Sequence, residues 1–312
     1  MNIKNDLLAA AQKLTPYIHR TPVLRSQQLN SMAGCELFFK CENFQKMGAF
    51  KMRGATHALL SLSKEQQAKG VVTHSSGNFA QALALAAKNL HIKAHIVMPS
   101  DAPEVKKAAV RGYGGLITEC EPNVQSRQAT AQQIQEETGA TFVHPFNDFN
   151  VVLGNASAAK ELLEDHPDLD CIIAPVGGGG LISGTLLSTL AFAPKVTVIG
   201  AEPFEVDDAY RSLEAGHIVE NSTTHTIADG LKTNLGDITF AIIQNYIEGI
   251  VRVTEEEIIA AMRLIWERMK IIVEPSCATT LAVVLKNKAQ FKSKKVGLIL
   301  TGGNVDLKKL PF

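Results

Sequence analysis

Lys51 is the residue whose type and neighbours point most directly to covalent chemistry. It lies within residues 48–54, where apolar Ala49 and Phe50 precede it and a glycine stands at each end. Burial against Phe50 would lower the pKa of the amine by desolvation and leave more of the neutral nucleophile. Such a lysine forms Schiff bases, most often with pyridoxal 5′-phosphate (PLP). Taken alone, however, this run is explained better by a surface lysine at the start of a helix than by a reactive lysine.

A run of four glycines predicts a phosphate site. Its members are Gly177, Gly178, Gly179 and Gly180. The run follows a predicted strand at residues 170–174 and opens a predicted apolar helix at 181–192. Four backbone amides without side chains, at the positive end of a helix dipole, can cradle a phosphate. A tight turn would need only one or two glycines, and the spelling of residues 177–186 fits neither the dinucleotide motif nor the Walker A motif.

Two other loops after predicted strands offer polar groups. The first comprises Ser75, Ser76, Gly77 and Asn78. Its hydroxyl and backbone donors at a helix start can bind a carboxylate, whereas an ordinary helix cap would need only one serine. Thr301, after the last predicted strand, could offer its hydroxyl to a ring nitrogen.

Residues 202–208 carry four carboxylates directly after another predicted strand. Carboxylate oxygens are hard ligands that suit Mg²⁺ or Ca²⁺. A solvated, acidic helix start accounts for the same composition equally well. The residues alone therefore leave open whether this segment binds a metal ion.

The composition excludes several classes of protein. The 312 residues contain 31 Lys plus Arg and 31 Asp plus Glu, so the formal net charge of zero indicates neither nucleic-acid nor acidic-membrane binding. The five scattered cysteines form no Cys-x-x-Cys, which favours a reducing compartment over a disulfide framework or zinc ribbon. The N-terminal residues do not resemble a secretory signal, and no apolar run is long enough to span a membrane. We therefore expect a cytoplasmic protein that acts on a small molecule.

Short, continuous apolar runs alternate with helical patterns along the whole chain, which predicts an α/β fold with open, mostly parallel sheets covered by helices. The predicted strands are residues 36–40, 70–73, 94–98, 116–119, 141–143, 170–174, 196–201, 249–253 and 296–300. The predicted helices include residues 4–14, 50–62, 78–90, 103–112, 124–138, 154–164, 181–192, 254–270 and 277–287. Because ligands of such sheets bind at the carboxyl ends of strands, we expect the motifs to share one cleft.

In this order, the motifs resemble those of the fold-type II PLP-dependent enzymes, in particular serine racemase and its relatives, the serine/threonine and 3-hydroxyaspartate dehydratases. The resemblance covers essentially the whole chain and is carried by residues 40–54, 75–78, 177–180, 226–230 and 302–306. It implies the tryptophan synthase β-like fold, with two open sheets and the cofactor in an interdomain cleft.

The resemblance also implies a domain division and roles for individual residues. A large PLP-binding domain would comprise residues 1–51 and 146–312, and a small mobile domain residues 52–145. Lys51 would bind PLP covalently and then act as a base at the substrate Cα, while the glycine run binds the phosphate. The other residues expected at the cofactor are Phe50 against the ring, Asn78 at the ring hydroxyl, Gly230, Glu274 and Thr301.

The same resemblance assigns a substrate site and a metal site. The substrate carboxylate would be bound by Ser75, Ser76, Gly77 and Asn78, with Arg127 in support. Mg²⁺, or Mn²⁺ or Ca²⁺ in its place, would be held by the side chains of Glu202 and Asp208 and the carbonyl of Val206. A homodimer is also implied.

The expected reaction is the PLP-dependent dehydration of a small β-hydroxy amino acid to a 2-oxo acid and ammonia. Serine, threonine and 3-hydroxyaspartate remain open as substrates. Ser76 could supply an acid/base group opposite Lys51, so an amino-acid racemase with elimination as a side activity is the alternative. A PLP-binding protein without turnover is a more remote one.

Overall fold

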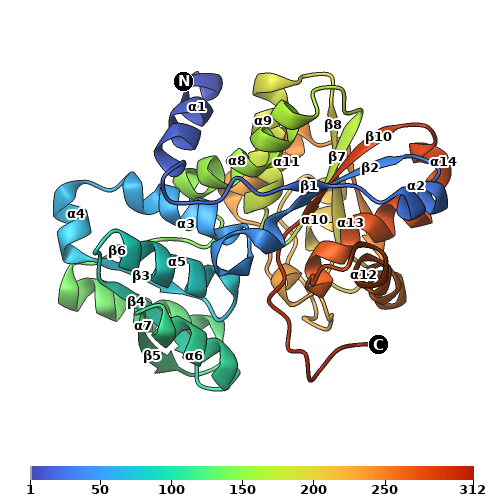
Figure 1. Ribbon diagram of the computed structural model, residues 1–312. Coiled ribbons are helices and arrows are strands. Elements are labelled where there is room, and N and C mark those ends of the chain that lie inside the picture. The colour runs from blue at the N-terminus through green and yellow to red at the C-terminus, as the bar shows by residue number, and fades with distance from the viewer. Residues whose placement is uncertain (1) are drawn as a thin grey trace.

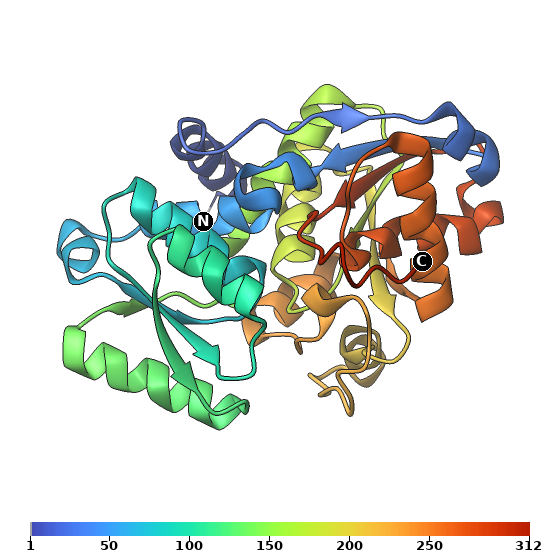
Figure 2. The same cartoon turned by 60° about the horizontal axis from the view of Figure 1, so that its bottom comes forward.

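A computed structural model describes residues 2–312 of the chain and contains two open sheets (Figure 1). The smaller sheet has the strand order β5-β4-β3-β6, and all of its strands run parallel. Its strands are β3 (Val71–His74), β4 (Ala94–Pro99), β5 (Leu116–Cys120) and β6 (Thr141–Phe142). With its helices, this sheet forms a lobe that lies apart from the larger sheet in Figures 1 and 2.

The larger sheet has the order β1-β2-β10-β7-β8-β9 and is parallel except for the antiparallel strand β1 at its edge. Its strands are β1 (Val23–Leu24), β2 (Glu36–Cys41), β7 (Cys171–Pro175), β8 (Thr197–Pro203), β9 (Gly249–Val253) and β10 (Lys295–Leu300). Helices connect the parallel strands, as parallel pairing requires. The predicted fold class is therefore confirmed.

Fourteen α-helices occur in the described residues. They are α1 (Ile3–Leu14), α2 (Gln27–Ala33), α3 (Lys51–Leu60), α4 (Lys64–Lys69), α5 (Asn78–Asn89), α6 (Glu104–Gly112), α7 (Val124–Thr138), α8 (Phe149–Asp165), α9 (Gly180–Phe192), α10 (Asp208–Ala215), α11 (Asp237–Tyr246), α12 (Glu255–Met269), α13 (Pro275–Lys286) and α14 (Lys288–Phe291). The 3₁₀ turns are η1 (Glu42–Phe44), η2 (Lys46–Gly48) and η3 (Asp229–Leu231). Across residues 2–312, no helix combines the length and hydrophobicity that a bilayer crossing demands.

Both faces of each sheet are buried, which explains why the strands read as continuous apolar runs. On the larger sheet, α2, α12 and α13 cover one face, and α8, α9, α10 and α11 cover the other. On the smaller sheet, α3, α5 and α6 share one core with Val71 and Ile96, while α7 packs on Val72 and Val97 of the opposite face. Buried faces on both sides fix the strand register and so the position of each strand end.

The sequence analysis missed β1 and the helices α2, α4, α10, α11 and α14, and it began α8 five residues too late. Helix α4 has no buried residue, so it has no apolar period to detect. Helix α8 passes through Gly154, which was predicted as a helix start. A methyl group there would lie 2.5 Å from the carbonyl oxygen of Arg53, so the glycine permits close contact between α3 and α8. The predicted domain boundaries remain a prediction.

Candidate functional site

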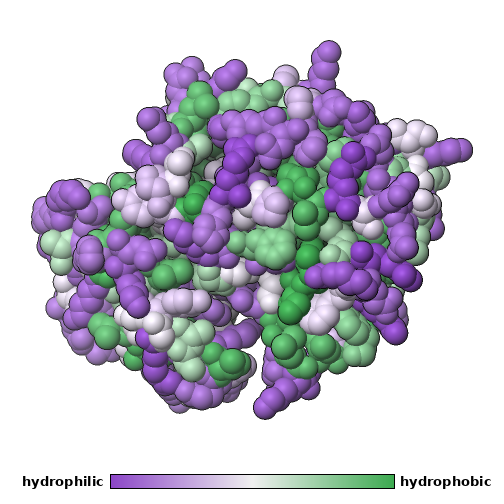
Figure 3. All heavy atoms as spheres, in the orientation of Figure 1, coloured by the Kyte–Doolittle hydropathy of each residue, from purple (hydrophilic) through white to green (hydrophobic). Residues whose placement is uncertain are grey.

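The loops that follow β3, β6, β7 and β10 meet at one place. Loops after parallel strands of both sheets thus contribute to a single site, as expected for ligands of open α/β sheets. Figure 3 shows that the surface is notched at its lower edge between the two lobes. The contacts described below join the smaller-sheet loops to the larger-sheet loops.

Lys51 is the first residue of α3 and its amine is directed into this meeting point. Its Nζ atom donates a hydrogen bond to the carbonyl oxygen of Pro145, at 3.1 Å, in the loop after β6. The amine also lies 5.0 Å from the ring centre of Phe50 and 5.8 Å from that of Phe79. Burial lowers the pKa of the amine to about 8, although the nearby carboxylate of Glu274 opposes this shift. A larger fraction of the amine is therefore neutral near physiological pH than for an exposed lysine.

The glycine run forms the buried loop between β7 and α9. Gly179 has a φ of +85°, a left-handed conformation that suits glycine, and it precedes a helix start without a side-chain cap. A methyl group on Gly178 would lie 2.3 Å from the ring of Phe146. The loop therefore packs too closely on its neighbours for larger residues, and it presents the amino end of α9 to a ligand.

Asn78, the first residue of α5, is held at both ends of its amide. Its Nδ2 group donates to both oxygens of Glu274, at 3.1 and 3.0 Å. Its Oδ1 atom accepts from Nδ2 of Asn304, at 2.9 Å, and Asn304 also donates to the carbonyl of Met47. Burial and the charge of Asp229 raise the pKa of Glu274 to about 7. Asn78 thereby links the smaller-sheet helices to two loops of the larger sheet.

Thr301 lies beside Phe50, and Gly230 lies beside the glycine run. The hydroxyl of Thr301 is buried and has no hydrogen-bond partner among residues 2–312, while its carbonyl accepts from the amide of Phe50 at 3.0 Å. Such an orphaned hydroxyl can serve an absent ligand atom. Gly230 lies beside the glycine run, because a methyl group on Gly177 would come within 2.9 Å of the Gly230 carbonyl oxygen.

The predicted substrate loop continues directly from β3 and is half-buried throughout. Its amide at Gly77 donates to the hydroxyl of Ser75 at 3.3 Å, and the Ser76 hydroxyl makes no hydrogen bond within residues 2–312. The Nε atom of Arg127 is buried and has no partner in the part of the chain that the structure describes. Burial, with a further contribution from the charge of Arg127, lowers the pKa of His74, the residue just before this loop. Arg127 is thus close to the loop's origin.

The predicted metal-binding residues come together away from Lys51, where β8 leads into α10. Glu202, Val206 and Asp208 are all fully buried. Both oxygens of Glu202 accept backbone amides of the first turn of α10, at 2.9 Å each. Burial and the charge of Asp208 raise the pKa of Glu202, and burial raises that of Asp208 to about 6. The raised pKa values mean that the two neighbouring carboxyl groups lose their protons less readily than exposed ones. A bound cation would stabilise their ionised forms, and carboxylate oxygens are suitable ligands for it.

The description of residues 2–312 includes no group of three His, Cys, Asp or Glu side chains that could hold a metal ion. A cation at the Glu202 and Asp208 site would therefore need backbone oxygens as further ligands. The donor set of two carboxylates and one carbonyl is chemically suitable for Mg²⁺ but does not require it.

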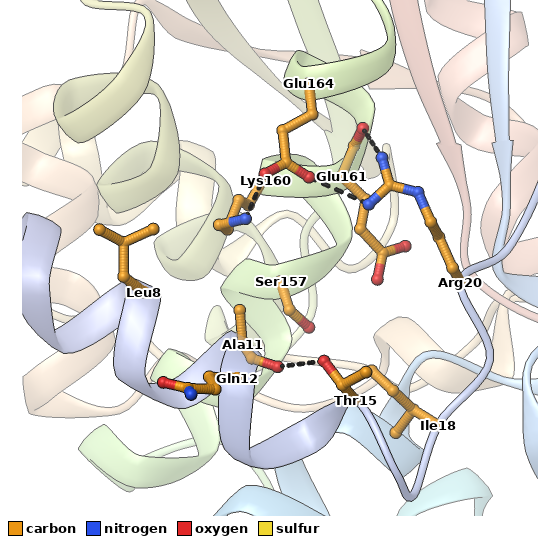
Figure 4. A pocket seen from close by; sticks show the side chains of 10 residues that line it. All are labelled: Leu8, Ala11, Gln12, Thr15, Ile18, Arg20, Ser157, Lys160, Glu161 and Glu164. Atoms are coloured by element: carbon orange, nitrogen blue, oxygen red, sulfur yellow. Dashed lines mark hydrogen bonds and ion pairs between the residues drawn. The ribbon is translucent and has the colours of Figure 1, made fainter.

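A separate cavity of about 350 Å³ lies between α1 and α8 (Figure 4). Its charged walls pair with one another: Arg20 donates to Glu164 at 3.0 Å, and Lys160 also pairs with Glu164. Ser157 and Glu161 form part of its wall. None of the residues at the strand ends described above lines this cavity.

Sequence reasoning missed three contributors to the site. The carbonyl of Pro145 and the ring of Phe146 belong to a loop in which the sequence analysis placed only a domain boundary. Asn304 lies in residues 302–306, which were quoted only for the family resemblance and gave no indication of its contact with Asn78. No signal in a single sequence identifies a backbone acceptor or a contact between such distant residues.

Comparison with known proteins agrees with this geometry. The chain matches the family described as pyridoxal-phosphate dependent enzyme over residues 14–302. The β-hydroxyaspartate dehydratase of Paracoccus denitrificans (strain Pd 1222) is 51% identical over 307 residues, which cover 98% of each chain. Serine racemase of Dictyostelium discoideum is 48% identical over 309 residues, covering 98% of this chain and 95% of that protein. The crystal structure of serine racemase from the same organism matches with a TM-score of 0.94 and 49% identity, covering 97% of this chain and 99% of that chain.

The residues at the strand ends fit PLP. A partly deprotonated lysine suits the carbonyl of PLP, and the glycine loop at the start of α9 suits its phosphate. The unpartnered hydroxyl of Thr301 suits a polar atom of its ring, whereas the amide of Asn78 is already bound by Glu274 and Asn304. These fits rest on the chemistry of the protein groups alone.

Proposed function

Because the chain belongs to the pyridoxal-phosphate dependent enzyme family, we propose that it dehydrates a small β-hydroxy amino acid to a 2-oxo acid and ammonia. The observation that carries this proposal is the buried Lys51 amine, with its lowered pKa, at the meeting point of the strand-end loops. A family of PLP enzymes supports many reactions, so the reaction is inferred from the site and from the relatives rather than from the fold.

In this proposal, Lys51 removes the Cα proton of the substrate. The Cα–H electron pair forms the Cα–Cβ double bond as the Cβ–O bond breaks, and the hydroxyl leaves as water with the proton that Lys51 took from Cα. Bound PLP supplies the electron withdrawal that makes the Cα proton acidic. Hydrolysis of the resulting enamine then gives the 2-oxo acid and ammonia. The lowered pKa of Lys51 favours this role, because a base that is neutral near working pH can accept the proton.

The proposed substrate class follows from the polar loop after β3. The loop of Ser75, Ser76 and Gly77 precedes the uncapped start of α5, which suits the α-carboxylate. Arg127, with its buried and unpartnered Nε atom, is proposed to support the substrate. Serine, threonine and 3-hydroxyaspartate all satisfy these requirements, and a 3-hydroxyaspartate substrate would additionally need a cation for its second carboxylate.

Racemisation is the second candidate function, and Ser76 is the observation that favours it. Its hydroxyl lies in the proposed substrate loop without a recorded side-chain partner among the described residues. Proton return from Ser76 to the face opposite Lys51 would invert Cα and leave the hydroxyl in place. A relative of 48% identity is a serine racemase.

We also propose that Glu202, Asp208 and the carbonyl of Val206 bind Mg²⁺ or a similar divalent cation. The raised pKa values of the two buried carboxylates support this proposal, because a cation would offset their mutual repulsion. A homodimer and a cytoplasmic location are proposed in the same way. All five cysteines are buried and unpaired, which suits a reducing compartment.

A proton NMR time course in D₂O tests the reaction. Purified protein with PLP and Mg²⁺ would be incubated separately with L-serine, L-threonine and L-threo-3-hydroxyaspartate. Appearance of a 2-oxo acid supports the dehydratase and names its substrate. Loss of the Cα signal without oxo acid, followed by the opposite enantiomer in a chiral assay, supports the racemase. If neither occurs with any substrate, the proposal is wrong.

Ser76→Ala separates the two functions. A racemase that uses Ser76 should lose inversion and keep elimination of at least one enantiomer. Equal survival of both activities would contradict an acid/base role for Ser76. Lys51→Ala is the companion variant, since full turnover without this amine would exclude the proposed base.

A further inference from the structure

Arg53, two residues beyond Lys51, carries a fully buried charge. Among residues 2–312, none of its side-chain hydrogen bonds reaches the loops that surround the Lys51 amine. Successive helical residues are about 100° apart, so positions 51 and 53 point to nearly opposite sides of α3. Lys51 therefore faces the site while Arg53 faces the interior behind the helix. Burying a guanidinium costs free energy unless its donors are hydrogen-bonded, so the groups that bind Arg53 must offset this cost.

Two carboxylates hold Arg53 from different elements. Glu42 of η1 accepts from Nε at 2.7 Å and from the second terminal nitrogen at 2.8 Å. Glu161 of α8 accepts from both terminal nitrogens, at 2.8 Å each. The side chains of Arg53 and Glu42 are 0% exposed and that of Glu161 is 11% exposed, so solvent screens these bonds little.

Lys40, Thr21 and Ser157 also belong to this group, which we call the Arg53 network. Lys40 donates to Glu161 at 2.6 Å and to the carbonyl of Thr21 at 2.7 Å. The Thr21 hydroxyl donates to Glu42 at 2.5 Å. With two cations and two carboxylates, the network is neutral, and it ties α3 to β2, η1, α8 and the segment before β1. Although burial opposes its charge, the bonds from Arg53 and Lys40 hold the pKa of Glu161 below its usual value.

The start of α3 lacks a side-chain cap. Its capping residue is Phe50, and no side chain caps the first turn. Backbone bonds alone close this turn: the Phe50 amide donates to the Thr301 carbonyl at 3.0 Å, and the Arg53 amide donates to the Phe50 carbonyl at 2.9 Å. A lysine that acts as a base must be held within a fraction of an ångström of its proton, and the first turn of a helix without a cap tends to fray.

We propose that Arg53 is a positioning residue: through Glu42 and Glu161 it fixes the first turn of α3 and thereby the Lys51 amine, an inference that rests on the proposed function. The fork geometry of the guanidinium is essential, because it engages two carboxylates at once.

The test compares Arg53→Lys with Lys160→Met in the PLP holoenzyme. Arg53→Lys keeps the charge but loses the two-sided fork. Lys160→Met breaks an ion pair on the same helix as Glu161 and at the same cavity, but Lys160 does not contact Arg53. For Arg53→Lys, kcat per bound PLP should fall about 10- to 100-fold with little change in KM. The control should lose thermal stability at most.

Two readouts do not require turnover. Backbone amides of residues 50–53 should exchange hydrogen faster in Arg53→Lys than in the wild type or in Lys160→Met. The pH midpoint of the visible PLP band should also shift by roughly 0.5 unit or more, because the Lys51 environment changes. If the wild type proved to dehydrate no β-hydroxy amino acid, these two readouts would still decide the role of Arg53.

Chemical rescue provides a more stringent test. Glu161 lines the cavity of Figure 4, so the gap left by Glu161→Ala opens toward a space that acetate can enter. Acetate should restore turnover and slow the exchange at residues 50–53, while chloride at equal ionic strength should not. Should Arg53→Lys fail to fold, Glu161→Gln takes its place in the same measurements. Unchanged kcat per PLP and unchanged exchange in the folded variant would overturn the proposal.

Discussion

Gly178→Ala is expected to weaken PLP binding by an amount that the packing of the glycine loop sets. The new methyl group would lie 2.3 to 2.4 Å from three ring carbons of Phe146. Carbon atoms in contact normally lie about 3.5 to 4.0 Å apart, so the ring or the loop must move by at least about 1.2 Å. The Phe146 ring has little room, because the ring of His144 lies against it with centres 4.6 Å apart.

Overpacking of this kind costs about 1 to 3 kcal/mol. If the loop yields rather than the ring, this free energy is lost from PLP binding and the Kd rises about 5- to 150-fold. The assay is a titration of the PLP-free protein with PLP, followed by the visible band. Gly249→Ala is the matched control, because a methyl group there meets no atom within 4 Å.

Adding Phe146→Leu to Gly178→Ala identifies the cause. Leucine removes the ring that the methyl group would strike, so the double variant should recover part of the lost affinity. Wild-type affinity in Gly178→Ala alone would refute the reasoning, because it would show that the loop tolerates a side chain. A loss of affinity that Phe146→Leu deepens would assign the effect to something other than this clash.

Two further predictions concern charge. Glu274→Gln removes a carboxylate that raises the pKa of Lys51, so the pKa of the amine should fall. The midpoint of the rise of kcat/KM with pH should therefore move to lower pH than in the wild type. A midpoint that moves to higher pH would contradict this. Mg²⁺ should raise the Tm of the wild type in a concentration-dependent manner, and Asp208→Asn should abolish that response. Asp207→Asn is the control, since the Asp207 carboxylate is bound by Arg211 and Arg252 and is not a proposed ligand. If Mg²⁺ left the Tm of the wild type unchanged, the proposed metal site would be excluded.

The parts of the fold that were predicted are those in which burial leaves a mark on the sequence. Strands covered on both faces must be apolar at every position, so β7 and β10 are visible as continuous runs. Helix α4 buries no residue and so shows no apolar face, and α10 is only eight residues long and opens with the acidic segment. Gly154 was predicted as a helix start, whereas it lies inside α8 and lets α3 approach.

Some residues of the candidate site could also be predicted from the sequence, and others could not. Lys51 and the glycine run could be identified because their chemistry depends on residue type and local spacing. The contact of Asn304 with Asn78 joins residues 226 positions apart, and the Pro145 acceptor is a backbone carbonyl. Arg53 belonged to a recognisable motif, but its partners Glu42 and Glu161 are assembled by the fold. Local sequence therefore indicates the reactive groups, and only the structure reveals what holds them.

The central place of β10 in the larger sheet has a consequence for synthesis on the ribosome. β10 pairs with β2 on one side and β7 on the other, yet it follows every other strand in the chain. Until it emerges, β1-β2 and β7-β8-β9 are separate pieces with unpaired apolar edges, which are sites for misassembly. At common elongation rates, roughly 250 residues between β2 and β10 correspond to about 13 to 50 s of exposure. We therefore expect chaperones to be needed at these unpaired edges until β10 has been synthesised and pairs with β2 and β7.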